Sequence, residues 1–513
     1  MPFMIFNYRQ IFSTSAILKI RKTIELRKWR RGLGLNLQTH VRNTNPKSIL
    51  IATNIGGNLN TMAFDAVLGI ALRSRGHNVY FTLCDGALTA CMYCELNKFR
   101  TLEEFKTRKA QKLCNGCSKT GQHILNLAGF KALLIKADGK SSSESWDLEI
   151  ADSGTKRFLA KGRIDDPEEY TKVFEEYLKS SQIVNGEARE IFSRNQVDLM
   201  IAHHGIYVPQ GNMVAVAKEF DIPVVTWVQG YRKQSFLLGI GDTYHKSLLT
   251  ESYDVEDLQP DEKKEIKEYL NSRDIGERDW IKFSSVSRND STNVDLGRNK
   301  TKVLLLTNVS WDAQLHYSSR VFPDMHAWID ETIQWFKRNS HLDLIIRIHP
   351  AEITGRIKAR DPILKYIEER FPDLPINIKV IGPEDKVSTY KLMDICDLGL
   401  IFATKAGIEL AVLGKPLIVA GESWIRGRGL SVDPTTKQEY FAQLEKFSKN
   451  PNSLPTNVES ALKFAHYFFF QKTQKVNSIK ALSRYPYLRP QIKREWELTD
   501  PGLLKLIHSI ENL

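Results

Sequence analysis

The chain has 513 residues, of which 42% are hydrophobic and 26% charged, a balance typical of a soluble globular protein with two or three domains. No apolar run approaches the roughly 20 residues that a membrane-spanning helix needs, so the sequence predicts no integral membrane segment. The net charge of +12 is concentrated in residues 1–45, which carry nine Lys or Arg and one Glu. The rest of the chain therefore lacks the extended basic surface of a nucleic-acid-binding protein.

The basic segment forms a predicted N-terminal extension over residues 1–46. Within residues 9–31, apolar residues such as Ile24 and Trp29 alternate with lysines and arginines, a pattern typical of an amphipathic basic helix. We predict that this helix lies on an anionic membrane surface. A helix packed on the protein, or a mitochondrial-type targeting peptide, would give the same pattern. Because the segment lacks the apolar run and cleavage site of a secretory signal, we expect a cytoplasmic protein, peripheral at the inner face of the membrane.

A Rossmann-like α/β domain is predicted over residues 47–290. Its first unit is a buried strand at 48–53, a turn through Gly56 and Gly57, and a helix that ends near Arg75. This βαβ unit lacks the GxGxxG spacing, so it does not indicate a tightly bound dinucleotide. Further predicted strands extend the same sheet, at 77–83, 197–202 and 222–228.

Five of the six cysteines lie within residues 84–124, a predicted insertion in the first domain. Four of them form two CxxC pairs, which are Cys91, Cys94, Cys114 and Cys117. Two such pairs at this separation fit the four-thiolate geometry of structural zinc, so we predict a structural zinc site held by these four cysteines. An iron–sulfur cluster and a pair of disulfides are the alternatives, and disulfides are disfavoured in a reducing cytoplasm.

Polar residues at predicted strand ends of the first domain are candidates for a general base. His203 and His204 follow the strand at 197–202, and their imidazoles suit proton transfer near neutral pH. By strand alternation, one of the two should point into a cleft beside the sheet. Asp85 follows another strand and is the third candidate. We predict no catalytic divalent ion.

A second Rossmann-like domain is predicted over residues 300–476, after a polar and turn-rich linker at 285–300. Its two most informative stretches are "LIIRIHP" and "LGLIFATKAGIELAVLGKP", each a buried strand that ends in polar residues. Because ligands bind beyond the carboxyl ends of strands in open α/β sheets, these polar residues should converge on one site. They are Arg347, His349, Thr404, Gly407 and Glu409.

The chemistry of these residues indicates a nucleotide-sugar pocket. The predicted helix start near Thr404 offers backbone N–H groups to a phosphate. Glu409 can accept hydrogen bonds from ribose hydroxyls, Arg347 and His349 can bind phosphate oxygens, and Gly407 allows close approach of the backbone. Asn308, Ser310 and Asp312, in the loop after the first strand of this domain, can bind phosphate or sugar hydroxyls. Arg426 and Arg428 can neutralise the leaving phosphate.

From about Lys302 to Gln443 the sequence resembles the C-terminal domain of GT-B glycosyltransferases, most of all the branch that makes bacterial capsule and surface polysaccharides. The resemblance rests on the HP dyad at His349 and Pro350, and on the runs "STYKLMDICDLGL" and "TKAGIELAVLGKP". It implies a nucleotide-sugar donor bound to the second domain and a glycan or lipid-linked acceptor bound to the first.

The resemblance also implies roles for single residues. Donor contacts are implied for His349, Thr404 and Glu409. Acceptor contacts are implied for the first loop of the first domain, at Asn54, Gly56 and Gly57. Asp85 is similar to the base in an acid-glycine motif of sialyltransferase-like relatives. The C-terminal tail, residues 477–513, is implied to pack back on the first domain.

We therefore predict a GT-B glycosyltransferase in which two Rossmann-like domains face each other across a cleft. It would move a sugar from a nucleotide-sugar donor to a surface polysaccharide or a lipid-linked glycan, with hexosyl and Kdo or sialyl transfer both open. A sugar-nucleotide epimerase or hydrolase of the same fold is one alternative. A non-catalytic scaffold in polysaccharide assembly is the other.

Overall fold

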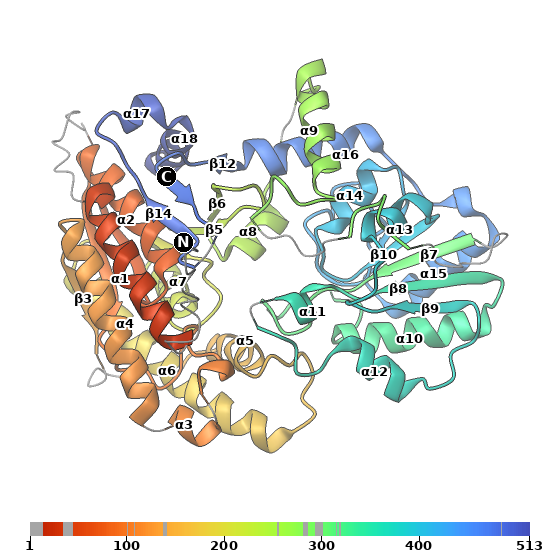
Figure 1. Ribbon diagram of the computed structural model, residues 1–513, viewed down its shortest axis with the longest axis horizontal. Coiled ribbons are helices and arrows are strands. Elements are labelled where there is room, and N and C mark those ends of the chain that lie inside the picture. The colour runs from red at the N-terminus through yellow and green to blue at the C-terminus, as the bar shows by residue number, and fades with distance from the viewer. Residues whose placement is uncertain are drawn as a thin grey trace, which may run out of the picture.

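The computed structural model is built on parallel sheets with helices on their faces, which confirms the predicted α/β class (Figure 1). The structure describes residues 14–33, 45–99, 101–106, 108–136, 141–253, 256–280, 286–292, 301–313, 315–317, 320–355, 357–483 and 485–513. Within these ranges it does not describe the side chains of residues 14–22, 97, 106 and 108–111.

The first sheet has the strand order β12-β6-β5-β4-β1-β2-β3. Its strands are β1 (Ser48–Asn54), β2 (Asn78–Cys84), β3 (Ala132–Ile135), β4 (Leu199–His203), β5 (Val224–Gln229), β6 (Ser235–Ile240) and β12 (Thr473–Lys475). The strands from β5 to β3 pair in parallel, whereas β6 pairs antiparallel with both β5 and β12. Every residue of β1 is buried, as expected for a parallel strand covered by helices on both faces.

The second sheet has the order β11-β10-β7-β8-β9, and its paired strands are parallel. They are β7 (Thr301–Leu306), β8 (Leu342–Arg347), β9 (Ile378–Ile381), β10 (Leu398–Ile401) and β11 (Leu417–Val419). The chain runs outward from β7 to β9 and then returns to the other side of β7 with β10. The strand order therefore reverses between β7 and β10, the place where open α/β sheets bind ligands.

Helices and short helical turns connect the strands of both sheets. Those that follow strands of the first sheet are α2 (Leu59–Ser74), η2 (Leu96–Lys98), α3 (Leu102–Lys106), α4 (Arg108–Leu127), α5 (Asp147–Leu159), α6 (Pro167–Arg194), α7 (Gln210–Glu219) and α8 (Tyr244–Thr250). Those of the second sheet are α10 (Met325–Arg338), α11 (Ala351–Thr354), α12 (Ile363–Arg370), α13 (Thr389–Ile395), α14 (Ala406–Val412), α15 (Lys437–Lys449) and η3 (Pro451–Ser453). Asn58, Asp166 and Asp324 cap α2, α6 and α10 by accepting a hydrogen bond from a first-turn amide.

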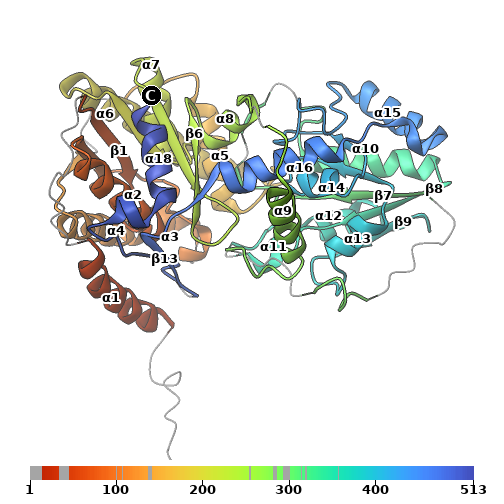
Figure 2. The same ribbon diagram turned by 90° about the horizontal axis from the view of Figure 1, so that it is seen from above.

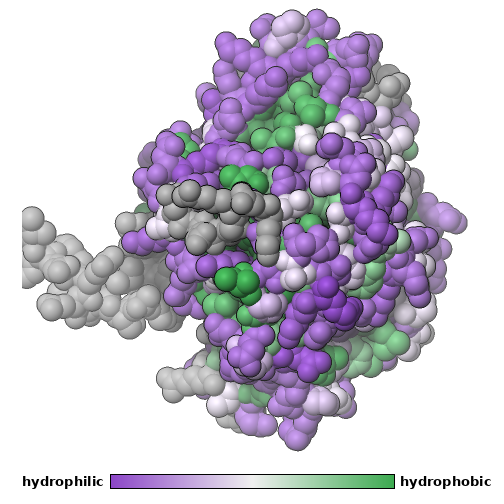
Figure 3. Space-filling view, turned by 90° about the vertical axis from the view of Figure 1, so that its right-hand side faces the viewer, coloured by the Kyte–Doolittle hydropathy of each residue, from purple (hydrophilic) through white to green (hydrophobic). Residues whose placement is uncertain are grey.

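The second domain buries its apolar side chains on both faces of its sheet. Alternate residues of β7 enter different clusters, with Leu304 and Leu306 on one face and Val303 and Leu305 on the other. The outer face of this domain is mostly hydrophilic, with smaller apolar areas (Figure 3). The cluster that holds Leu304 and Leu306 also contains Leu237 of β6 and Leu248 of α8, so it joins the two domains.

α9 (Pro260–Ser272) precedes the predicted linker and packs where the two domains meet. Its Ile266 and Tyr269 lie in one hydrophobic cluster with Leu237 of β6 and Leu304 of β7. The chain returns through α16 (Val458–His466), which lies between the two domains in Figure 2, and through the π-helix η4 (Tyr467–Gln471). β12 then joins the first sheet.

The C-terminal segment lies against the first domain, on the same side of the molecule as α1 (Figure 1). It contains β13 (Ile479–Ala481), β14 (Leu488–Pro490), α17 (Trp496–Thr499) and α18 (Pro501–Glu511). Trp496, Leu503 and Ile507 enter the same hydrophobic cluster as Phe64 of α2. The C-terminal segment thus packs in the same hydrophobic core as β1 and α2.

α1 (Thr14–Leu33) packs on the protein at its C-terminal end. Trp29 and Leu33 are buried in the first-domain core, and Arg489 donates two hydrogen bonds of 2.7 Å to the Glu25 carboxylate. Trp29 is therefore not available to a membrane, and for this residue the alternative of a helix packed on the protein is correct. Residues 9–13 and the side chains of 14–22, which the membrane prediction also used, lie outside the described part. No described helix is long and apolar enough to cross a membrane.

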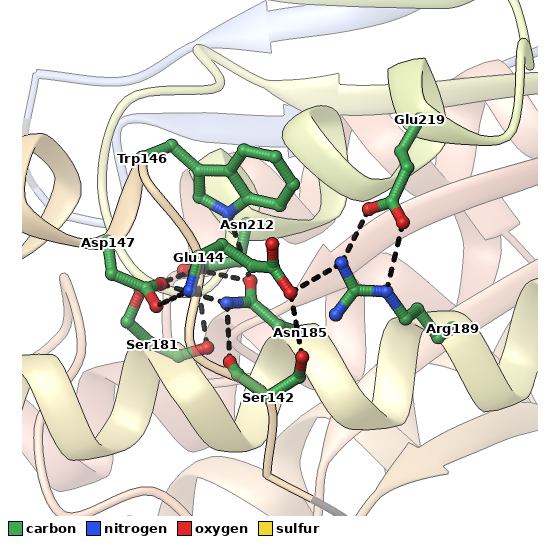
Figure 4. A network of polar contacts seen from close by, with 9 residues as sticks. All are labelled: Ser142, Glu144, Trp146, Asp147, Ser181, Asn185, Arg189, Asn212 and Glu219. Carbon is green, nitrogen blue, oxygen red and sulfur yellow. Dashed lines mark hydrogen bonds and ion pairs between the residues drawn. The ribbon is translucent and has the colours of Figure 1, made fainter.

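A buried polar network holds α5 against its neighbours (Figure 4). The Asp147 carboxylate accepts hydrogen bonds from the Ser181 hydroxyl at 2.5 Å and from the Asn185 amide at 2.8 Å. Asn212 donates in turn to the Asn185 side-chain carbonyl at 2.9 Å. These residues join α5, α6 and α7, and the network therefore sets the position of α5, which also carries Arg157.

Candidate functional site

A cavity of about 510 Å³ lies between the two domains and is lined by residues of both. Its volume is within the range of sites that bind small molecules. Glu95, Arg157 and His245 line it from the first domain. Residues around the carboxyl ends of β7, β8 and β10 line it from the second. Polar groups on both sides therefore face one shared cleft.

The order of the second sheet brings the predicted donor residues together. Thr307 follows β7, His349 follows β8 and Thr404 follows β10, and these strands are neighbours in the sheet. All three residues line the cavity, as does Glu409 on α14. His349 and Thr404 are far apart in the chain, and the strand reversal at β7 places them at one sheet edge.

His349 lines the cavity with a neutral imidazole. The Ala351 amide donates to its Nδ1 at 3.1 Å, so the neutral ring carries its proton on Nε2. Burial, together with the positive charges of Lys405 and Arg347, lowers the pKa of His349 to about 4. Near neutral pH this side chain is therefore a hydrogen-bond donor through Nε2 and not a cation.

Glu409 lies in the cavity wall within an ion-pair network. Its carboxylate accepts from Arg273 Nε at 2.7 Å and from Lys405 Nζ at 3.1 Å. Arg273 also pairs with Asp279 at 2.5 Å and donates to the Tyr269 hydroxyl at 2.8 Å. Burial alone would raise the pKa of Glu409, but the charges of Arg273 and Lys405 outweigh it and lower the pKa to about 2. The carboxylate is thus ionised, and because a carboxylate offers several acceptor positions, it can still accept from a sugar hydroxyl.

The loop after β7 carries buried donors that have no hydrogen-bond partner among the described residues. They are the Ser310 hydroxyl, the Trp311 indole N–H, the Tyr317 hydroxyl and Nε of Arg320, and all four residues line the cavity. Each such group costs about 1–3 kcal/mol while it lacks an acceptor. Their concentration in one wall indicates a ligand rich in acceptor oxygens. Asn308 lines the same wall, and its Nδ2 donates to the Ala403 carbonyl at 3.2 Å.

Arg157 of α5 forms the opposite wall. Its Nη1 donates to the Met92 carbonyl at 2.9 Å and its Nη2 to the Glu95 carboxylate at 3.3 Å. Nearby, the Tyr207 hydroxyl donates across the domain boundary to Asp312 at 2.7 Å. Sequence reasoning did not find Arg157, because a single arginine on an amphipathic helix has no local signal that separates it from a surface residue.

The three predicted catalytic residues do not line this cavity. His203 lies in the first-domain interior, with Nδ1 3.4 Å from the Thr61 hydroxyl. His204 has a φ of 43°, and its Nδ1 accepts from the Ile206 amide at 2.9 Å. Asp85 is exposed at the end of β2. The structure therefore places none of these three side chains in the wall of the cavity, although the segment after β4 reaches the second domain through Tyr207.

His245 is the first-domain histidine that lines the cavity. It lies in α8, and its ring centroid is 5.4 Å from that of Trp424 in the second domain. Burial lowers the pKa of His245 to about 4, so its ring is neutral near pH 7 and can accept a proton. It was missed because it follows an antiparallel strand, where the rule of parallel strand ends gives no guidance.

The predicted acceptor loop is buried against the cysteine-rich insertion. A Cβ on Gly56 would lie 2.5 Å from Gly121 Cα, and one on Gly57 would lie 2.6 Å from an aromatic ring. Asn54 is fully buried and has a φ of 56°. None of the three residues lines the cavity. Gly56 instead allows α4 to pack closely on the loop, and Gly57 allows the Tyr93 ring to do so.

Several predicted donor residues are held by the protein itself. Gly407 does not line the cavity, and a Cβ there would lie 2.6 Å from the Ile401 side chain, so tight packing accounts for this glycine. Arg347 lines the cavity but donates to a main-chain carbonyl and a threonine hydroxyl. Arg426 and Arg428 do not line it and donate to main-chain carbonyls.

The predicted four-cysteine zinc site is not supported by the geometry. In the part of the chain that the structure describes, no group of three or more His, Cys, Asp or Glu side chains is arranged to hold a metal ion. None of the six cysteines is in a disulfide. The five cysteines of the insertion nevertheless line one small cavity in the first domain, apart from the main one.

Residues 260–453 match the protein family described as capsule polysaccharide biosynthesis protein. This match confirms the resemblance that the motifs between Lys302 and Gln443 indicated. None of the curated proteins matches the chain.

The solved structures to which this chain is similar include two transferases and an epimerase. The KpsC β-Kdo 2,4-transferase of Thermosulfurimonas dismutans is 15% identical, with 56% of this chain and 88% of that chain covered and a TM-score of 0.36. The β-Kdo 2,7-transferase of the same KpsC is 10% identical, with 62% of this chain and 89% of that chain covered and a TM-score of 0.31. The UDP-GlcNAc 2-epimerase from Neisseria meningitidis, bound to UDP-GlcNAc, is 12% identical, with 83% of this chain and 99% of that chain covered and a TM-score of 0.26. Similarity at this level assigns no role to any residue.

Proposed function

We propose that this protein is a glycosyltransferase that moves a sugar from a nucleotide-sugar donor to a capsule or surface polysaccharide, or to its lipid-linked precursor. The observation that supports this most strongly is the set of buried donors without protein acceptors, in a cavity at the strand reversal of the second sheet. The family match over residues 260–453 supports the same class of activity.

The donor nucleotide binds to the second-domain wall in this proposal. His349 donates from Nε2 to a phosphate oxygen, and Glu409 accepts from a ribose hydroxyl. Ser310 and Arg320 donate to oxygens of the phosphates or the sugar. Fixed donors of this kind stabilise the negative charge that grows on the departing phosphate, which is the main electrostatic demand of glycosyl transfer from a nucleotide.

The acceptor enters against the first-domain wall, between Arg157 and His245. His245 accepts the proton of the attacking hydroxyl as the new glycosidic bond forms. A bound phosphate beside it would raise the pKa of this imidazole from about 4 toward the working pH. Because both walls belong to one cavity, substrates that fill it also exclude water and so suppress hydrolysis of the donor.

Product analysis with a panel of nucleotide sugars tests the proposal. Each donor is incubated with the protein, with and without capsule-type oligosaccharide acceptors, and the products are resolved by mass spectrometry and NMR. We expect turnover that depends on the acceptor. Rapid formation of an epimer or of free sugar without acceptor would show that the protein is an epimerase or a hydrolase and not a transferase. Absence of both turnover and nucleotide binding would favour the non-catalytic scaffold.

We also propose that the exposed basic residues of α1 contact an anionic membrane surface. Arg27, Arg30 and Arg31 are exposed while Trp29 is buried, so the contact would be electrostatic. Each cation near the surface contributes about 1 kcal/mol at low salt. Sedimentation with vesicles tests this contact: binding to vesicles with phosphatidylserine but not to purely phosphatidylcholine vesicles is expected. Equal binding to both, or to neither, would refute it.

A further inference from the structure

A second cavity, in the first domain, is walled by cysteines. It has a volume of about 20 Å³ and is also lined by Asn54 and by apolar side chains. The cysteines are Cys84, Cys91, Cys94, Cys114 and Cys117. They come from β2, from the loop after it and from α4. Isolated buried cysteines are ordinary small apolar residues, but five that converge from separate segments indicate thiolate chemistry.

Main-chain N–H groups donate to two of the sulfur atoms. The Gly57 amide donates to Cys117 Sγ at 3.0 Å and the Gly86 amide to Cys84 Sγ at 3.4 Å. Asn54 is fully buried, and although its Oδ1 accepts from a threonine hydroxyl, its Nδ2 has no partner among the described residues. Because a buried amide N–H without an acceptor costs free energy, Asn54 indicates an acceptor that the protein itself does not supply.

The five thiols line one cavity, and no three of them are arranged to hold a single metal ion. Tetrahedral zinc needs four ligands at about 2.3 Å from a single centre, and the described side chains include no such group. An iron–sulfur cluster is held differently, because its thiolates bind several iron atoms and its sulfides accept hydrogen bonds from nearby N–H groups. We propose that this cavity binds an iron–sulfur cluster through the thiolates of the insertion, in place of the single zinc ion that the sequence predicted.

The cluster site adjoins the main cavity through residues 91–95. Cys91 and Cys94 flank Met92 and precede Glu95, and the Met92 carbonyl and Glu95 carboxylate are the acceptors that hold Arg157. A cluster that fixes this segment therefore positions Arg157 in the acceptor wall. This consequence rests on the proposed transferase function, whereas the cluster itself does not.

Metal and sulfide analysis of the full-length protein, purified without oxygen, tests the proposal. We expect iron and acid-labile sulfide in near-equal amounts, about two or four of each per chain, with the visible absorption of thiolate-bound iron. Cys94→Ala and Cys117→Ala, one from each CxxC pair, should lose most of the iron. Cys396→Ala changes a buried cysteine of the second domain and should retain it.

Zinc at one atom per chain without iron or sulfide would overturn the cluster in favour of a single-ion site. Absence of both iron and zinc would overturn the proposal that these thiols bind a metal. If the alanine variants fail to fold, analysis of the unaltered protein still decides between these outcomes. Protein without its cluster should lose transfer while a nucleotide stabilises it as before. Failure of the loaded protein to bind any nucleotide would count against the proposed function and not against the cluster.

Discussion

The buried ion pairs of Glu409 lead to a quantitative prediction for Glu409→Gln. Glutamine keeps the shape of the side chain but removes the charge that faces Arg273 and Lys405. Glu409 is 5% exposed, and its pKa is lowered from 4.5 to about 2. That difference corresponds to about 3 kcal/mol of folding free energy at pH 7. Breaking one partner of a buried ion pair costs about 3–5 kcal/mol. Since Arg273 keeps its pair with Asp279, we expect the lower value.

The pH dependence of this loss has a definite sign. The folded pKa of Glu409 lies below the unfolded value, so the folded state favours the ionised carboxylate. Its contribution is fully present above the unfolded pKa of 4.5 and is lost as pH falls through about 2. The difference between the unaltered protein and Glu409→Gln should therefore be about 3 kcal/mol at pH 7 and roughly half of that near pH 3.

Urea unfolding followed by tryptophan fluorescence measures this difference. Glu369→Gln is a matched control, because Glu369 is exposed on α12 and pairs with exposed Lys365 at 3.6 Å. A surface pair of this kind contributes about 0–1 kcal/mol. Equal midpoint shifts for Glu409→Gln and Glu369→Gln, or a loss that does not shrink in acid, would refute the ion-pair interpretation.

Three further predictions concern packing and catalysis. Gly56→Ala should lower the free energy of unfolding by about 1–3 kcal/mol in a thermal-unfolding assay, because its methyl group would meet the α4 backbone. Gly116→Ala, where a methyl group meets nothing within 4 Å, should not destabilise the protein in the same assay. Trp29→Ala should cost about 3 kcal/mol or more in chemical unfolding, whereas Ile24→Ala at an exposed position should cost little, and equal effects would argue against packing of α1 on the core. His245→Ala should lower kcat for sugar transfer about 100-fold or more while nucleotide binding stays unchanged, and an unchanged kcat would remove this residue from the mechanism.

Much of the fold could be predicted because parallel strands buried on both faces are continuous apolar runs. The residues of β1 and β10 have this character, and turn residues bound them. The placement of α9 could not be predicted in the same way. Its sequence is charged and amphipathic, and only tertiary contacts show that Ile266 and Tyr269 pack between residues of both sheets.

Some residues of the candidate site could likewise be predicted from the sequence, and others could not. His349, Thr404 and Glu409 could be predicted because they follow strand ends whose neighbours are set by the sheet order. Arg157 and Arg273 could not, because they reach the cavity from helical segments distant in sequence. The glycines show a different limit, since a glycine required for close packing and one required for ligand approach look alike in a sequence.

Calorimetric titration with CMP, UDP, GDP and dTDP tests the central claim most directly, that the second-domain wall binds a nucleotide. The account predicts saturable binding of at least one of them, weakened about tenfold or more in His349→Ala, since a hydrogen bond to a charged phosphate contributes about 1.5–3 kcal/mol. His341→Ala, which removes an exposed imidazole of the same domain, should bind as the unaltered protein does. Binding of none of the four nucleotides, or equal binding by His349→Ala and His341→Ala, would contradict it.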